Sequence, residues 1–263
     1  SVTPAYKVYP LPAVETVAAA PGQAVLAADT RLPVPREAFS CIPRPGGQGF
    51  GNERKWRWIP LLEATDREGR RRGHPAWLLL NQAFPFAGSA VAVFGIGDPA
   101  LYRSAPLANA VVSTVRRLRQ GVFLSEGGAR HFSWWPGEKV ELGATASNLG
   151  ARRTTVLLRL QVETKEGGRP LFREEVRLGL APGDTRSLTR AWDPAGITDE
   201  CRVTVELVRS GKVIDRIRHD FGFLPSGKPD PDEFITVRGS DFIVKGQRWY
   251  GIGVNYWPLY VSG

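Results

Sequence analysis

The chain has 263 residues, of which 42% are hydrophobic and 23% charged, with a formal net charge of +9. These values are typical of globular proteins, exclude a disordered chain, and leave room for two or more domains. No apolar run approaches the roughly 20 residues that cross a bilayer, so we expect no membrane partner. The arginines form separated clusters or alternate with glutamates, as on solvated faces, so we also expect no nucleic-acid partner.

Residues 1–53 are rich in proline, alanine and glycine. Because proline blocks helix interiors and glycine marks turns, short extended pieces joined by turns are predicted there. Aromatic and aliphatic runs at 55–66 and 74–84 flank the polar REGRRRG, which predicts a β-hairpin. The continuous apolar run at 88–97 predicts a strand buried on both faces.

A helix is predicted between Pro106, near its start, and Gly121, just past its end. Its expected apolar face recurs at helical spacing and consists of Leu107, Ala110, Val111, Thr114, Val115 and Leu118. With the strand expected at 122–128, this helix would complete something close to a βαβ unit.

The turn Gly95-x-Gly97-x-x-Ala100 lies between a strand and this helix, and Glu126 ends the next strand. A dinucleotide fingerprint would use such glycines for the pyrophosphate and a carboxylate for the ribose. Pro99 inside the loop, the late helix start and the single βαβ unit favour an ordinary strand-to-helix turn. We therefore predict no cofactor.

Metal and thiol chemistry would depend on two cysteines, Cys41 and Cys201, and on three histidines. No CxxC motif is present and no histidine has a partner at ligand spacing, so we predict no metal site. The pattern favours two separately buried thiols, and a disulfide in an oxidising compartment is the alternative.

From residue 129 the sequence consists of alternating or β-branched runs broken by Gly, Pro, Asn and Asp. Six or seven short strands over this length predict an immunoglobulin-like sandwich, so the expected fold is mainly β with a smaller α/β piece before the sandwich. Trp134 and Trp135 open this region. If both rings are exposed, they are a candidate sugar-stacking platform. The favoured interpretation is that they pack at the junction between the sandwich and the preceding α/β piece.

Residues 225–234 are rich in Pro, Gly and acidic side chains and are predicted to be a linker. Beyond them DFIVKGQRWYGIGVNYWP, residues 241–258, resembles the entry to the catalytic (β/α)8 barrel in a clan of glycoside hydrolases. That clan includes β-galactosidases, β-mannosidases, β-glucuronidases and cellulases. The resemblance rests on a hairpin at Phe242–Gln247 and a Gly-x-Asn strand at Tyr250–Asn255, and the Asn148-Leu149-Gly150 turn resembles one in the clan's accessory sandwiches.

The resemblance implies that the last strand begins a TIM barrel, with Asn255, Tyr256 and Trp257 bordering a glycone subsite. The two catalytic carboxylates of such enzymes follow the fourth and seventh barrel strands, so the resemblance implies no catalytic residue within these 263 residues. It also implies a secreted parent of carbohydrate metabolism, extracellular or periplasmic, although the sequence shows no signal peptide. The unpaired C-terminal strand would permit self-association.

We therefore predict a non-catalytic accessory region of a carbohydrate-active enzyme, with carbohydrate as its partner. The alternative is a self-contained β-sandwich that binds carbohydrate or protein at a cell surface. The expected domains are an extended segment at 1–53, an α/β piece at 54–128, an immunoglobulin-like sandwich at 129–224, a linker at 225–234, and the hairpin and first strand of a truncated barrel at 235–263.

Overall fold

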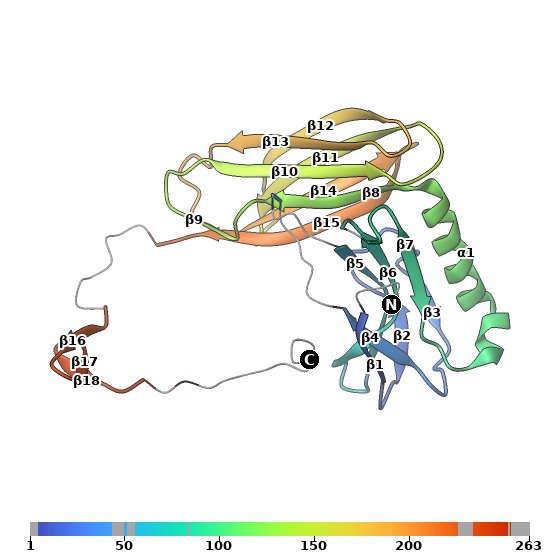
Figure 1. The fold of residues 1–263 in the computed structure, drawn as a ribbon, viewed down its shortest axis with the longest axis horizontal. Helices are drawn as coiled ribbons and strands as arrows, with labels where there is room; N and C mark the ends of the chain where they lie inside the picture. Colours follow the sequence, from blue (N-terminus) through green and yellow to red (C-terminus); the bar gives the residue numbers. More distant parts are fainter. Residues whose placement is uncertain are drawn as a thin grey trace.

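The computed structural model describes residues 5–43, 50–51, 56–83, 85–225, 234–251 and 253, with the backbone alone at 5–7 and 41–43. The described chain is mainly β and contains several antiparallel sheets, which confirms the predicted fold class. Figure 1 shows an upper sandwich, a lower body formed by the N-terminal strands, and the helix α1 beside both.

The lower body is built on a five-stranded antiparallel sheet with the order β3-β2-β5-β6-β7. Its strands are β2 (Thr16–Ala19), β3 (Arg31–Leu32), β5 (Trp56–Thr65), β6 (Arg71–Asn81) and β7 (Ala90–Phe94). A two-stranded ribbon joins β1 (Ala5–Pro10) to β4 (Phe39–Pro43). The predicted hairpin is β5–β6 and is confirmed. The strand predicted to be buried on both faces is β7, which is half-buried because it lies at the sheet edge.

Helix α1 (Ala105–Gln120) follows a short 3-10 helix, η1 (Pro99–Arg103), and ends at Gly121 in the left-handed conformation, as predicted. Its buried face differs from the predicted one, since Val115 is 48% exposed and Arg117 is buried. The predicted βαβ unit is wrong, because β7 pairs antiparallel with β6 and the strand after α1 joins another sheet. Within the described residues no helix is both long and apolar enough to span a bilayer.

The sandwich packs a three-stranded sheet, β13-β10-β8, against a five-stranded sheet, β12-β11-β14-β15-β9. The first sheet contains β8 (Val122–Ala129), β10 (Val140–Asn148) and β13 (Thr185–Trp192). The second contains β9 (Ser133–Trp134), β11 (Thr154–Thr164), β12 (Pro170–Leu180), β14 (Cys201–Arg209) and β15 (Lys212–Phe223). When β9 is left out of the count, β8, β10 and β13 are the first, second and fifth strands of the sandwich. These three share one sheet, as the corresponding strands do in immunoglobulin-like sandwiches. Since β8 pairs with β10, the sandwich begins at residue 122 and not at the predicted 129.

The last described strands, β16 (Thr236–Arg238), β17 (Asp241–Val244) and β18 (Gln247–Trp249), form a separate three-stranded sheet. Figure 1 shows this sheet apart from the sandwich. Lys245 and Gly246 have φ values of 50° and 75°, as a type I′ hairpin turn requires, and the hairpin predicted at Phe242–Gln247 is confirmed. Of the first barrel strand predicted at Tyr250–Asn255, the structure describes Tyr250, Gly251 and Gly253, which follow β18 and belong to no strand. Asn255, Tyr256 and Trp257 lie outside the described residues.

Candidate functional site: the junction at strand β8

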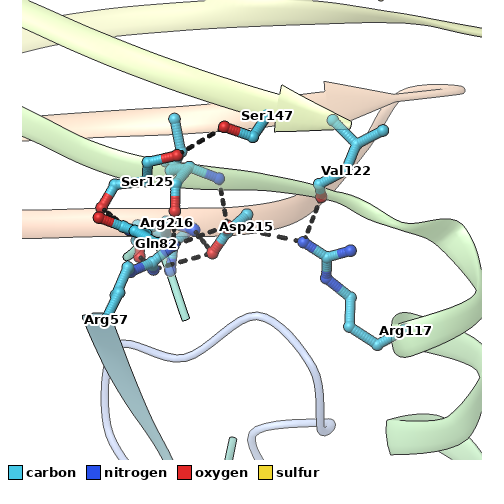
Figure 2. Close-up of polar contacts among 9 residues, drawn as sticks. Arg57, Gln82, Arg117, Val122, Ser125, Ser147, Asp215 and Arg216 are labelled. Atoms are coloured by element: carbon cyan, nitrogen blue, oxygen red, sulfur yellow. Dashed lines mark hydrogen bonds and ion pairs between the residues drawn. The ribbon is translucent and has the colours of Figure 1, made fainter. Parts of the chain in front are cut away.

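Strand β8 lies near the contact between the lower body and the sandwich, and side chains from both regions bond to its backbone (Figure 2). Arg57 of β5 donates from Nη1 to the carbonyl oxygen of Leu124 at 2.8 Å. Arg117 of α1 donates from Nη2 to the carbonyl oxygen of Val122 at 2.6 Å. Residues from β5 and α1 therefore fix the position of one strand of the sandwich.

A single carboxylate, that of Asp215 on β15, connects these two arginines. It accepts hydrogen bonds from both terminal nitrogens of Arg57, at 2.7 and 2.9 Å, and from the backbone N–H of Leu124 at 2.8 Å. Its Oδ2 lies 3.6 Å from Nη2 of Arg117. All three charged side chains are buried, and we call them the junction cluster.

The charges in the junction cluster are unevenly balanced. Burial raises the pKa of the Asp215 carboxyl, but the charges of Arg57 and Arg117 and the hydrogen bonds outweigh it, so that the pKa lies below its ordinary value. Burial lowers the pKa of the Arg117 guanidinium to about 10, which leaves the group protonated at neutral pH. Nη1 of Arg117 is buried without a hydrogen-bond partner in the described structure, and the guanidinium lies 3.8 Å from the ring centroid of Phe123. Arg117 is thus the less well compensated cation.

A groove of about 670 Å³ lies beside the cluster, between the β6–β7 connection and the outer face of β8, β10 and β13. Hydroxyl groups cross this face in a row: Ser125 Oγ is 2.7 Å from Ser147 Oγ, which is 2.9 Å from Thr185 Oγ1. Gln82 at the opposite wall donates from Nε2 to the carbonyl oxygen of Ser125 at 2.8 Å. The groove therefore offers hydroxyl and amide groups suited to hydrogen bonding with a neutral polar ligand.

Glu126 is the one ionisable side chain among the described residues that line the groove, and it accepts a hydrogen bond from Thr145 at 3.3 Å. Hydrolysis of a glycosidic bond ordinarily needs two carboxyl groups about 5 to 9.5 Å apart. In the described part of the chain, no group of three or more His, Cys, Asp or Glu side chains could hold a metal ion. The described lining of the groove therefore supplies hydroxyl and amide groups and one carboxylate.

The structure separates the two tryptophans of the predicted sugar platform. Trp134 in β9 belongs to the sandwich core at 6% exposure, and its Nε1 donates to the carbonyl oxygen of His131 at 3.1 Å. Trp135 is 53% exposed. A joint platform of two exposed rings is therefore not formed.

The glycines of the dinucleotide-like turn approach the chain itself. A Cβ at Gly95 would clash with the carbonyl oxygen of Phe39, and one at Gly97 would lie 2.9 Å from Cβ of Glu37. Residues 37–39 therefore lie close against both glycines, which leaves no room for a side chain at either position. Cys201 is a free, buried thiol whose pKa burial raises to about 11; the side chain of Cys41 lies outside the described atoms.

Sequence reasoning missed the junction cluster, although one signal for it existed. Arg117 continues the helical spacing of Leu107, Ala110 and Thr114, so it falls on the buried face. Asp215 likewise shares a strand face with Ile217 and Phe221, which belong to the sandwich core. Charged residues at apolar positions of two elements indicate a buried ion pair, but nothing in the sequence shows that they meet.

The comparisons with known proteins gave similar solved structures only. No family model matches the sequence, and no match was found among curated proteins. A glycosyl hydrolase family 2 member from Bacteroides cellulosilyticus is 17% identical over 40% of this chain and 15% of its own, with a TM-score of 0.29. A β-glucuronidase from Bacteroides uniformis is 17% identical over 39% of this chain and 13% of its own, with a TM-score of 0.29. A β-glucosidase from Listeria innocua is 12% identical over 39% of this chain and 15% of its own, with a TM-score of 0.30.

These structural neighbours are glycoside hydrolases. The chain spans about 15% of the length of the first of them. At such identities and TM-scores the likeness assigns neither a family nor an activity to this chain.

Proposed function

We propose that this chain is a non-catalytic accessory region of a carbohydrate-active enzyme, a glycoside hydrolase of oligo- or polysaccharides whose catalytic barrel lies outside these 263 residues. The observation that carries the proposal is the hairpin of β17 and β18. It forms at Phe242–Gln247, where the resemblance to barrel entries requires one, and its turn has the required backbone conformation. The predicted subsite residues Asn255, Tyr256 and Trp257 follow it in the sequence.

The chemistry of the junction supports a non-catalytic role. The buried charges of the junction cluster are bonded to one another and to the backbone of β8, and the adjoining groove has one carboxylate among its described residues. A pair of carboxylates facing each other across a cavity would have supported hydrolysis instead.

A self-contained sandwich that binds carbohydrate or protein is the second candidate. The row of hydroxyl groups in the groove favours it, since such groups can bond a neutral sugar. The sheet β16-β17-β18 weighs against it, because these strands form their own sheet and do not complete an edge of the sandwich.

The proposal is tested by incubating the purified chain with aryl β-galactoside, mannoside, glucoside and glucuronide. We expect no release of the aryl group above the buffer blank. The matched variant Glu126→Gln removes the groove carboxylate and should give the same blank value. Turnover by the original chain that Glu126→Gln abolishes would contradict the proposal.

Titration calorimetry with neutral oligosaccharides separates the two candidates. The accessory role predicts weak binding or none, and Ser147→Val should leave the heat signal unchanged. Micromolar binding that Ser147→Val removes would favour the self-contained binding protein, because this substitution takes away the central hydroxyl of the row.

A further inference from the structure

A second hollow, of about 440 Å³, lies just before the start of β8, where α1 ends and β11 begins. Its rim consists of arginines from three separate segments: Arg116 and Arg119 of α1, Arg152 and Arg153 before β11, and Arg209 at the end of β14. All five are exposed, and the described residues that line the hollow include no acidic side chain. We call this set the arginine hollow.

The side chains of these arginines make no ion pair and no side-chain hydrogen bond with other described residues. Some other exposed arginines on the sandwich are paired: Arg173 binds Glu175 at 2.7 Å, and Arg130 binds Glu141 at 3.1 Å. Gathering unpaired like charges around one concavity raises the local positive potential and the local concentration of anions.

The end of the helix explains part of this arrangement only. Cations in the last turn of a helix are stabilised by its dipole, which accounts for Arg119. It does not account for Arg152, Arg153 or Arg209, which come from a loop and from a strand end. The convergence of the three segments therefore needs a separate explanation.

We propose that the arginine hollow binds an acidic glycan through carboxylate or sulfate groups. Planar guanidinium groups bind such oxyanions through paired hydrogen bonds, and five of them surround a space within the roughly 300 to 1,000 Å³ of small-ligand sites. The residues of this lining that the structure describes include no aromatic ring, so they offer no stacking surface of the kind on which single-stranded nucleic acids depend. The choice of a glycan rests on the proposed function, whereas the anionic charge rests on the arginines alone.

The test compares two double variants that each remove two positive charges. Arg119→Gln with Arg153→Gln removes charge from the hollow, and Arg103→Gln with Arg186→Gln removes it from exposed sites outside the hollow. The probes are a hexamer of galacturonic acid, a sulfated hexasaccharide, cellohexaose and a 20-base-pair DNA duplex, with binding measured by calorimetry at low and at physiological salt. The hydrolysis assay tests the accessory role independently of this binding assay. A lack of acidic-glycan binding would therefore overturn the inference about the hollow without contradicting the proposed function.

We expect the original chain and the control variant to bind at least one acidic hexamer and not cellohexaose. The hollow variant should bind about tenfold to a hundredfold more weakly, since it loses two charge-assisted contacts, and binding should weaken with salt. Preference for the galacturonate or for the sulfated probe identifies the anionic group. The proposal is overturned by an absence of acidic-glycan binding, by equal losses in the two variants, or by tighter binding of the DNA duplex.

Discussion

The junction cluster and the arginine hollow contain the same side chain in opposite environments. Arg116 and Arg117 are adjacent in sequence, yet the first is exposed at the hollow and the second is 4% exposed at the junction. A helix turns by about 100° per residue, which places neighbours on different faces. The buried arginines share a carboxylate, because an unpaired buried charge is strongly unfavourable, while the exposed ones are left to water or to a ligand. A cluster of arginines in a sequence therefore does not by itself indicate a surface.

The largest loss of stability is expected from Asp215→Asn, because this substitution leaves two buried cations without their counter-charge. We expect the free energy of unfolding, measured in urea, to fall by about 3 to 5 kcal/mol. Asp220→Asn removes an ion pair whose carboxylate is 29% exposed and should cost no more than about 1 kcal/mol. Equal losses in the two variants would show that the junction cluster has no special role.

Arg57 and Arg117 should differ when each is replaced by methionine. Arg57→Met removes a bidentate partner of Asp215 and should cost about 3 kcal/mol. Arg117→Met removes a cation that lies farther from the carboxylate and has an unbonded nitrogen, so less than half of that loss is expected. Urea unfolding of both variants measures the difference, and a larger loss for Arg117→Met would reverse the inferred ranking.

The stabilisation from Asp215 should depend on pH in the acid range. Its pKa is depressed in the folded protein, so the stabilisation is present above the unfolded value of about 3.9 and is lost as the pH falls through the folded value. The difference in unfolding free energy between the original chain and Asp215→Asn should therefore be constant from pH 7 to 5 and shrink below about pH 4. A difference that persists unchanged to pH 2 would contradict this linkage.

The smallest change in stability is expected from substitutions in the arginine hollow. Arg119→Gln with Arg153→Gln should leave the free energy of unfolding within about 0.5 kcal/mol, since both side chains are exposed and unpaired. The relief of repulsion between like charges is offset by the loss of the favourable interaction of Arg119 with the helix dipole, so no net gain is expected. A loss above about 1 kcal/mol in urea would mean that these arginines support the fold.

The parts of the fold that could be predicted are those determined by sequence patterns within short stretches of the chain. The hairpin β5–β6, the limits of α1 and the strand-rich sandwich follow from alternation, turn residues and caps within short stretches. The sheet membership of β8 could not be predicted, because its pairing with β10 competes with a βαβ arrangement that has the same order of elements.

The sites show the same limit. Arg57 and Asp215 are 158 positions apart, and the arginines of the hollow come from three segments. Trp134 and Trp135 show the same limit for two adjacent residues. The sequence pattern makes both rings candidates for sugar binding, but packing buries Trp134 in the core and leaves Trp135 exposed. Spatial proximity of distant residues is a product of tertiary packing, on which local patterns give no information.

The bonds made to β8 also affect how the molecule meets its own copies. This strand ends its sheet, and an uncovered sheet edge is a template on which another chain can add a strand and aggregate. Here side chains of Arg57, Arg117, Gln82, Asp215 and His219 bond backbone groups of β8 that its partner β10 leaves available. The junction cluster, together with Gln82 and His219, therefore leaves fewer backbone groups of this edge to which another chain could add a strand.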